Sequence, residues 1–404
     1  MQGKFTMIIV VIAGILIAFG LLFYFSIQSN EGFEMWNSTY GGSLDDTCYW
    51  VIEDDNNGFV MVGSTSSFGL GDSDAWLVKT DQKGNVLWNK TYGLSGYEAG
   101  LHLTKSYDGG FVFVGTTDSI GAGETDSWMV KTDSSGNLLW NKTYGGSLSD
   151  KIWRIVETSD RGFALGGFTN SFSAGDNDFW LLKTDSSGNL LWNKTYGGSG
   201  DERARGLISV SDGGFLLTGW TGSFGSGELD FWLIRTNSLG ELLWNRTYGG
   251  VLNERPIVVL ETDDGGFAIA GNTASFGKGE TDFYLIKTDV QGYEQWSKTF
   301  GGPLSETPFA LINTVDGGYA IAGSSYSFAV GENDFWLVKT DSNGEMLWNQ
   351  SYGGANGDEA RGLVQLDDEG YLMAGFSQSF GEGKKDFWLV KTDKNGNACA
   401  IILS

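Results

Sequence analysis

Hydrophobic and polar positions along the chain repeat with a period of 52 residues. One period, from Trp192 to Trp244, contains four short runs rich in aliphatic and aromatic residues, which read ARGLISVS, GFLLTGW, DFWLIRT and ELLWNRTY. Clusters of Gly, Asp, Asn and Ser separate the runs, and none of them shows the 3.6-residue spacing of an amphipathic helix. Each period therefore predicts four β-strands joined by turns.

Two series of aromatic residues mark the repeats. The first consists of tryptophans spaced 52 residues apart: Trp36, Trp88, Trp140, Trp192, Trp244, Trp296 and Trp348. The second follows an aspartate by two positions: Trp76, Trp128, Trp180, Trp232, Tyr284, Trp336 and Trp388. Four strands in each of seven repeats predict an all-β fold, a seven-bladed β-propeller of four-stranded antiparallel blades with aromatics packed between them. A linear β-solenoid is the alternative, but its rungs are usually about 20–30 residues long.

The repeat resembles those of seven-bladed propeller surface proteins of bacteria and archaea. The resemblance is carried by segments such as DGGF, SFGxGxxDFWLVKTD and GNLLWNKTYGG, and it extends from residue 35 to about residue 397. It implies a propeller domain over residues 35–404, displayed on the cell surface. It implies no single activity, because propellers carry many.

Two segments compete for the outermost strand of the last blade. Met35–Tyr40 keeps the outer-strand pattern, including Trp36, whereas Ala398–Leu403 has Ala400 where the tryptophan belongs. Filling the aromatic slot favours the N-terminal segment, and pairing the two chain ends restrains the ring against opening. The C-terminal segment follows its own hairpin turn and has the lower closure cost. We expect Met35–Tyr40 to pair with Asp386–Thr392.

The N-terminal segment predicts a membrane anchor. Residues 5–27 form 23 consecutive uncharged, mostly apolar residues, enough to span a bilayer as a helix. A cleaved signal peptide is the alternative, but the A-x-A-like exit is missing. Lys4 precedes the segment and Glu31 and Glu34 follow it, which places residues 1–4 in the cytoplasm, residues 28–34 as a short linker and the propeller outside the cell. The expected product is a single-pass protein of the cell membrane.

The charge and the cysteine count exclude several classes of function. A net charge of −24 and a pI of about 4.3 argue against binding to nucleic acid. Two cysteines in an extracellular chain do not make a disulfide scaffold. Cys48 and Cys399 fall at opposite ends and radii of the predicted blades, so we expect no bridge between them.

Catalytic chemistry has little support in the sequence. His102 is the only histidine and stands alone in a predicted inner strand, so no catalytic residue and no zinc site is predicted. The stretch Thr184–Trp192 is similar to the Asp-box turn of sialidases, but its spacing differs. We interpret it as a hairpin loop opened by Asp185 and closed by glycine.

A carboxylate follows each tryptophan of the first series by ten residues. The set is Asp46, Glu98, Asp150, Glu202, Glu254, Glu306 and Asp358. Just before the inner strands, these residues would form a ring at one mouth of the central channel and could hold Ca²⁺ or a cationic ligand. The alternative is that each caps loop amides or pairs with a neighbouring cation. We favour capping, because a feature of all seven blades is first a requirement of the blade. No other metal or cofactor is predicted.

Six sequons for N-glycosylation follow the tryptophans. Their acceptors are Asn37, Asn89, Asn141, Asn193, Asn245 and Asn349, and the seventh position is Ser297. On an outer strand outside the cell these asparagines would be accessible to a glycosylation pathway. Strand alternation around Trp and Thr explains the same residues without any glycan.

These observations favour an extracellular binding or adhesion module that recognises a protein or a glycan. Specificity is expected where the repeats differ, in the stretches DDTCYW, YEAGLH, SDKIWR, DERARG, NERPIV, SETPFA and DEARGL. The alternatives are a carbohydrate hydrolase or lyase with paired carboxylates at a channel mouth, and a structural component of the cell envelope.

Overall fold

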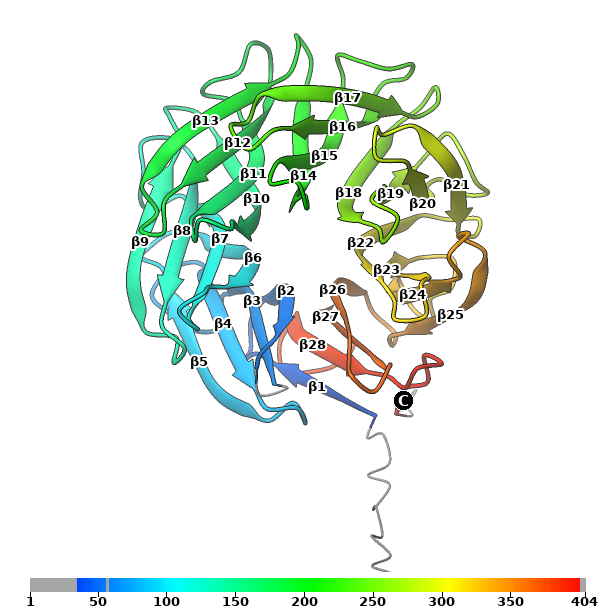
Figure 1. Cartoon of the computed structure of the whole chain (residues 1–404). Helices are drawn as coiled ribbons and strands as arrows, with labels where there is room; N and C mark the ends of the chain where they lie inside the picture. Colours follow the sequence, from blue (N-terminus) through cyan, green and yellow to red (C-terminus); the bar gives the residue numbers. More distant parts are fainter. Residues whose placement is uncertain (1–34, 56–57, 400–404) are drawn as a thin grey trace, which may run out of the picture. The chain divides into compact units, whose positions relative to one another are not determined.

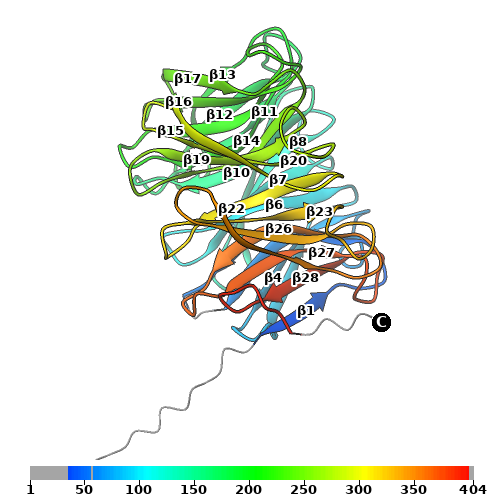
Figure 2. The same cartoon turned by 90° about the vertical axis from the view of Figure 1, so that its right-hand side faces the viewer.

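The computed structural model describes residues 35–55 and 58–399. Within these residues, 28 strands form seven four-stranded antiparallel sheets arranged as blades around one axis (Figure 1). The predicted seven-bladed β-propeller is confirmed. Viewed from the side, the strands of the β14–β17 blade and of the last blade lie stacked from the axis to the rim (Figure 2).

Each blade contributes one strand to each of four concentric positions. The innermost strands are β2 Asp46–Glu53, β6 Glu98–Lys105, β10 Asp150–Glu157, β14 Glu202–Ser209, β18 Glu254–Glu261, β22 Glu306–Asn313 and β26 Asp358–Gln365. The second strands are β3 Phe59–Thr65, β7 Phe111–Thr117, β11 Phe163–Thr169, β15 Phe215–Thr221, β19 Phe267–Thr273, β23 Tyr319–Ser325 and β27 Tyr371–Ser377.

The two outer positions follow in the same order. The third strands are β4 Asp74–Thr80, β8 Asp126–Thr132, β12 Asp178–Thr184, β16 Asp230–Thr236, β20 Asp282–Thr288, β24 Asp334–Thr340 and β28 Asp386–Lys391. The outermost strands are β5 Val86–Tyr92, β9 Leu138–Tyr144, β13 Leu190–Tyr196, β17 Leu242–Tyr248, β21 Glu294–Phe300, β25 Met346–Tyr352 and β1 Trp36–Tyr40.

The N-terminal strand closes the ring. Strand β1 pairs antiparallel with β28, from Trp36 opposite Lys391 to Tyr40 opposite Phe387, and the last blade has the order β1-β28-β27-β26 (Figure 1). The expected closure by Met35–Tyr40 is therefore confirmed. The C-terminal tail instead places the exposed Cys399 Sγ 3.0 Å from the carbonyl oxygen of Met35. Both Cys48 and Cys399 are free, as expected.

The predicted membrane anchor at residues 5–27, the cytoplasmic residues 1–4 and the linker 28–34 lie outside the described residues. The described part of the chain contains no helix that is long and apolar enough to cross a membrane. Membrane anchoring therefore stays a prediction.

The core lies between neighbouring blades and is built around the second aromatic series. These seven side chains are at most 5% exposed. Trp232, for example, packs its ring 4.8 Å from Phe179 of the preceding blade and 5.2 Å from Phe224 of its own. Such tilted aromatic pairs add to the large apolar area that each ring buries. The blades are thus held by face-to-face packing, as the sequence predicts.

The first tryptophan series is less enclosed than the sequence suggests. Trp192 on β13 is half-buried, with its ring 6.2 Å from Phe215 of the next blade and over the turn glycine Gly240. From the same strand, the hydroxyl of Tyr196 donates a hydrogen bond to the carbonyl of Gly240 at 2.5 Å. Gly240 has φ of 72°, a conformation that disfavours any side chain. One strand therefore clamps the hairpin of its neighbour.

An ion pair between a largely buried Lys or Arg and a turn aspartate fixes the hairpin between the first two strands of each blade. The Lys183 ammonium, with a side chain 8% exposed, lies 2.9 Å from the Asp160 carboxylate. Burial alone would raise the pKa of Asp160, but hydrogen bonds from Thr158 and Lys183 outweigh it and lower the pKa to about 2. Every blade has an equivalent pair. The recurrent turn aspartates are therefore structural.

Candidate functional site

The seven carboxylates of the predicted acidic ring are enclosed by protein. All of them are 0% exposed, and each is the first residue of its innermost strand rather than a residue before it. The Glu202 carboxylate accepts hydrogen bonds from the Gly198 amide at 2.8 Å, the Thr221 hydroxyl at 2.9 Å and the Ser223 amide at 2.9 Å. Equivalent amide bonds hold Asp46, Glu98, Asp150, Glu254, Glu306 and Asp358. This geometry supports the capping role.

A second carboxylate meets this ring at each blade junction. The aspartates that open the third strands accept loop amides, as Asp230 does from Ser226 at 2.7 Å. Their other oxygens approach the ring carboxylate of the next blade, and those of Asp126, Asp178, Asp282 and Asp334 are buried without a hydrogen-bond partner. Burial, together with the charge of Asp358, raises the pKa of Asp334 to about 6. Within the described residues, no three His, Cys, Asp or Glu side chains converge as a metal site requires.

Chemically diverse side chains meet at the axis because every innermost strand carries a β-bulge at its fourth residue. The bulged residues are Tyr49, Leu101, Trp153, Arg205, Ile257, Phe309 and Arg361. A bulge leaves one residue unpaired and re-aims its side chain. The bulged residue is an arginine in two blades, an aromatic residue in three and an aliphatic residue in two, so these positions carry no seven-fold chemistry.

At this level each arginine lies against an aromatic ring of a neighbouring blade. The Arg205 guanidinium lies 3.8 Å from the ring centre of Trp153. Arg361 lies 4.0 Å from the ring of Phe309 and 5.7 Å from that of Tyr49, and it forms an ion pair with Glu359. Stacking on aromatic faces holds a guanidinium in place while its N–H edges stay available.

Four further cations surround this ring of bulged residues. Lys151, Arg203 and Arg255 occupy the second position of neighbouring innermost strands, and Arg154 follows Trp153. Arg255 is exposed, and Arg203 is 39% exposed and bonded to Asp201 at 2.9 Å, so this level opens toward solvent. Burial, together with the charges of Arg205 and Arg203, lowers the pKa of Lys151. We call Lys151, Arg154, Arg203, Arg205, Arg255 and Arg361 the axial cation cluster.

The axial cation cluster was not predicted from the sequence. The stretches where the repeats differ are predicted to line the channel, but the site predicted there consists of their acids and not of their cations. A signal existed: the chain has eight arginines, and five of them lie on the innermost strands. In a chain of net charge −24, such a concentration of arginines on the innermost strands indicates a site.

His102 takes a structural role beside this cluster. Its Nδ1 accepts the Ile155 amide at 3.4 Å, and its ring lies 4.4 Å from that of Trp50. Burial, reinforced by the charge of Arg154, lowers the pKa of His102 well below its usual value. The imidazole is therefore neutral and occupied by a backbone contact, in line with the structural interpretation.

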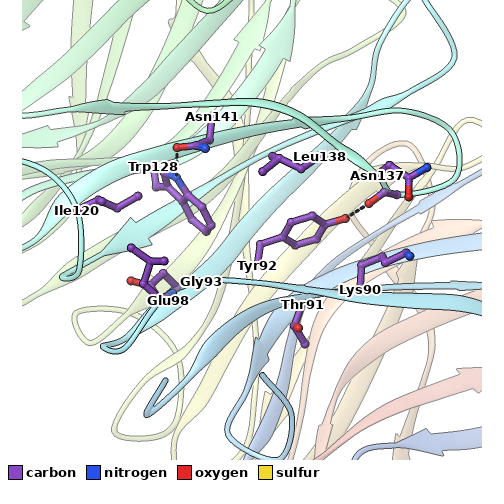
Figure 3. Close-up of a pocket in the computed structure, with 12 residues that line it drawn as sticks. Lys90, Thr91, Tyr92, Gly93, Glu98, Ile120, Trp128, Asn137, Leu138 and Asn141 are labelled. Carbon is purple, nitrogen blue, oxygen red and sulfur yellow. Dashed lines mark hydrogen bonds between the residues drawn. The ribbon is translucent and has the colours of Figure 1, made fainter. Parts of the chain in front are cut away.

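The sequon asparagines bind the core tryptophans. In six blades the asparagine Oδ1 accepts the indole N–H of the third strand at 3.1–3.5 Å, as Asn141 does from Trp128 (Figure 3). In the remaining blade a serine replaces the asparagine and a tyrosine replaces the tryptophan, and Ser297 forms a hydrogen bond with Tyr284. The asparagines thus have a structural function. N-glycosylation at these positions stays a prediction.

Surface pockets recur beside these asparagines. One of them, of about 540 Å³, lies between the first two blades and is lined by Tyr92, Trp128, Leu138 and Asn141, among others (Figure 3). The Tyr92 hydroxyl crosses it to the carbonyl of Gly136 at 2.6 Å. Similar pockets lie at other blade junctions. Their repetition indicates a consequence of blade packing.

Comparisons with known proteins establish the fold alone. No protein-family model and no curated relative matches the sequence. Among solved structures, a puromycin hydrolase matches with a TM-score of 0.53 and 13% identity over 84% of this chain and 53% of its own. An inactive virginiamycin B lyase from Staphylococcus aureus with quinupristin has a TM-score of 0.51 and 13% identity, covering 88% of this chain and 99% of its own. YCF48 bound to a D1 peptide has a TM-score of 0.50 and 11% identity, covering 89% and 94%.

Proposed function

We propose that this chain is an extracellular binding or adhesion module, anchored in the cell membrane by residues 5–27. The observation that supports binding at the axis is that repeated and non-repeated residues have different roles. Recurrent side chains are used in blade contacts, whereas the residues that differ between blades meet in the axial cation cluster. A rigid scaffold that presents one non-repeated surface suits recognition. The ligand is a protein or glycan outside the cell.

Propellers of similar fold serve both binding and catalysis, so the fold leaves both open. One of the similar structures holds a peptide and another holds quinupristin. A surface hydrolase or lyase would need two carboxylates across an open pocket. The recurrent carboxylate pairs of this chain lie instead in enclosed blade junctions, at most 3% exposed. This placement favours binding over hydrolysis.

The test is a glycan-and-protein array probed with the full-length chain in nanodiscs, with and without Ca²⁺. The axial variant replaces three cations by the threonine that other blades carry at the same position: Lys151→Thr, Arg203→Thr and Arg255→Thr. The matched control removes three lysines from the outermost strands: Lys90→Thr, Lys142→Thr and Lys194→Thr. We expect wild type and control to bind the same features and the axial variant to lose them. Equal binding by the axial variant would contradict the proposal, and turnover of an array glycan would favour the enzyme.

The proposed orientation is tested with the chain's own thiols. Cys399 is exposed, whereas Cys48 is buried and burial raises the pKa of its thiol. A membrane-impermeant maleimide should therefore label intact cells through Cys399 alone. Cys399→Ser should abolish the label, and labelling that requires cell lysis would place the propeller inside.

A further inference from the structure

We infer that the axis binds one compact anionic group, such as a carboxylate, a sulfate or a phosphate, between Arg205 and the neighbouring cations of the axial cation cluster. This inference rests on the proposed function, since it names the ligand chemistry of the same site.

The first support is the state of Arg205. Its guanidinium is half-buried and stacked on Trp153 at 3.8 Å. Within residues 35–55 and 58–399, it has neither a carboxylate partner nor a hydrogen-bond acceptor. Stacking uses the face of the guanidinium and leaves five N–H donors around its edge, in the planar fork that matches an oxyanion. Donors held rigidly without an acceptor form a prepared anion site.

The second support is the excess of positive charge. Among the described residues, two of the six cations have a carboxylate partner: Arg203 pairs with Asp201, and Arg361 pairs with Glu359. Asp201 is further shared with the indole of Trp220 at 3.1 Å. The described residues provide no carboxylate for the other four cations of the cluster. A bound anion would supply the missing negative charge.

The third support is mutual repulsion in the folded protein. Burial, together with the charges of Arg154, Arg361, Arg203 and Arg255, lowers the pKa of Arg205 to about 9. These residues come from four blades, so the ring closure itself forces like charges together. Repulsion of this kind destabilises the ligand-free fold. A bound anion would relieve this repulsion, and the relief would contribute to the free energy of binding.

The surface charge limits the size of the ligand. With a net charge of −24, the protein repels a long polyanion lying across its exterior. A single anionic group that enters along the axis avoids this field and meets Arg255 and Arg203 first, because these are the exposed members of the cluster. The terminal carboxylate of a peptide and an acidic sugar share this chemistry.

The experiment is calorimetric titration of the full-length chain in neutral detergent with citrate, sulfate and phosphate at matched ionic strength. We expect a stoichiometry of one anion per chain, because there is one axis but seven blade junctions. Arg205→Met should weaken binding by about 10–100-fold, the range for losing hydrogen bonds to a charged group. Arg246→Met is the matched control, since Arg246 also stacks on an aromatic ring, 4.3 Å from the centre of Tyr293, but lies on the outermost strand β17. Preference for citrate over the tetrahedral anions would identify a carboxylate ligand.

Thermal unfolding supplies a second measurement on the same proteins. Without added anion, Arg205→Met should melt at a higher temperature than wild type, because repulsion is relieved. Citrate should raise the melting temperature of wild type and the control more than that of Arg205→Met, which separates binding from the general stabilising effect of the salt. No binding by wild type, seven anions per chain, or equal affinity in Arg205→Met would overturn the inference. If Arg205→Met still binds the array ligands of wild type, the anion site is refuted but the proposed function stands. If wild type binds citrate but no array ligand, the anion site stands and the proposed function is refuted.

Discussion

Replacing Trp192 by alanine tests how the outermost strands hold neighbouring blades together. A fully enclosed tryptophan buries about 150–250 Å², worth roughly 4–6 kcal/mol at about 25 cal/mol per Å². Trp192 is half-buried, so we expect Trp192→Ala to lower the free energy of unfolding by roughly 2–3 kcal/mol. Trp180 is 2% exposed, and Trp180→Ala should cost more, about 3–5 kcal/mol.

The contact with Gly240 makes this prediction specific. A Cβ on Gly240 would stand 2.8 Å from one ring carbon of Trp192, and the positive φ adds strain of about 1–2 kcal/mol. Gly240→Ala alone should therefore cost this strain plus about 1–3 kcal/mol of overpacking. In the Trp192→Ala background most of this overpacking is relieved, although Lys194 Cγ remains 3.0 Å from the Cβ position. The double variant should be less destabilised than the sum of the single variants by about 1–3 kcal/mol.

The assay is chemical denaturation of wild type, the three single variants and the double variant, followed by far-ultraviolet circular dichroism because the removed tryptophan changes the fluorescence. Gly213→Ala is the control, since Gly213 also has a positive φ, of 90°, but nothing lies within 4 Å of its Cβ position. Additive effects of Trp192→Ala and Gly240→Ala would refute the contact between Trp192 and the Gly240 turn. Equal losses of stability in Trp192→Ala and Trp180→Ala would refute the difference in burial.

Three further outcomes are expected. Phe300 lacks the hydroxyl that other blades donate to the next hairpin. Phe300→Tyr should therefore raise the free energy of unfolding by about 0.5–1.5 kcal/mol through a hydrogen bond to the Gly344 carbonyl, and Tyr248→Phe should lower it by as much. Chemical denaturation measures both changes. The folded pKa of Asp334 is about 6 against an ordinary 3.8, so its stabilising contribution is complete below pH 3.8 and is lost as the pH rises through 6. Asp334→Asn should therefore be more stable than wild type at pH 7, by up to about 3 kcal/mol, and lose this advantage near pH 4, as thermal melts across pH will show. Calcium chelation should leave the melting temperature of wild type unchanged, because each inner-strand carboxylate already accepts a hydrogen bond from a loop amide; a fall would restore the calcium hypothesis.

The repeat period carried most of the fold prediction. Gly, Asp and aromatic residues at fixed offsets placed all four strands of a blade, and Trp36 against Ala400 identified the closing strand correctly. The innermost strand was expected to begin two residues later than it does, at Ala204 instead of Glu202. This small error hid the burial of the carboxylates, because a residue inside the strand is enclosed by its neighbours while one before it is open to the channel.

The axial cation cluster could not be derived from the same pattern. Alternation along a strand assigns side chains to its two faces, but the bulge at Arg205 and Arg361 breaks that alternation and redirects both toward the axis. Their approach also depends on closure of the ring, since Arg205 and Arg361 are 156 residues apart in the sequence. Repetition made the scaffold predictable, whereas the site consists of departures from it.

Ring closure by β1 also sets a schedule for biosynthesis. Strand β1 leaves the ribosome before any blade, yet its partner β28 is made almost last. At about 5–20 residues per second, the roughly 350 residues between them take about 20–70 s to synthesise. The first six blades can form one after another during that time, while Trp36–Tyr40 waits with an unpaired backbone edge. A nascent or truncated chain thus carries an exposed, adhesive strand until the final blade arrives, which gives proteases and chaperones a direct signal of incomplete synthesis.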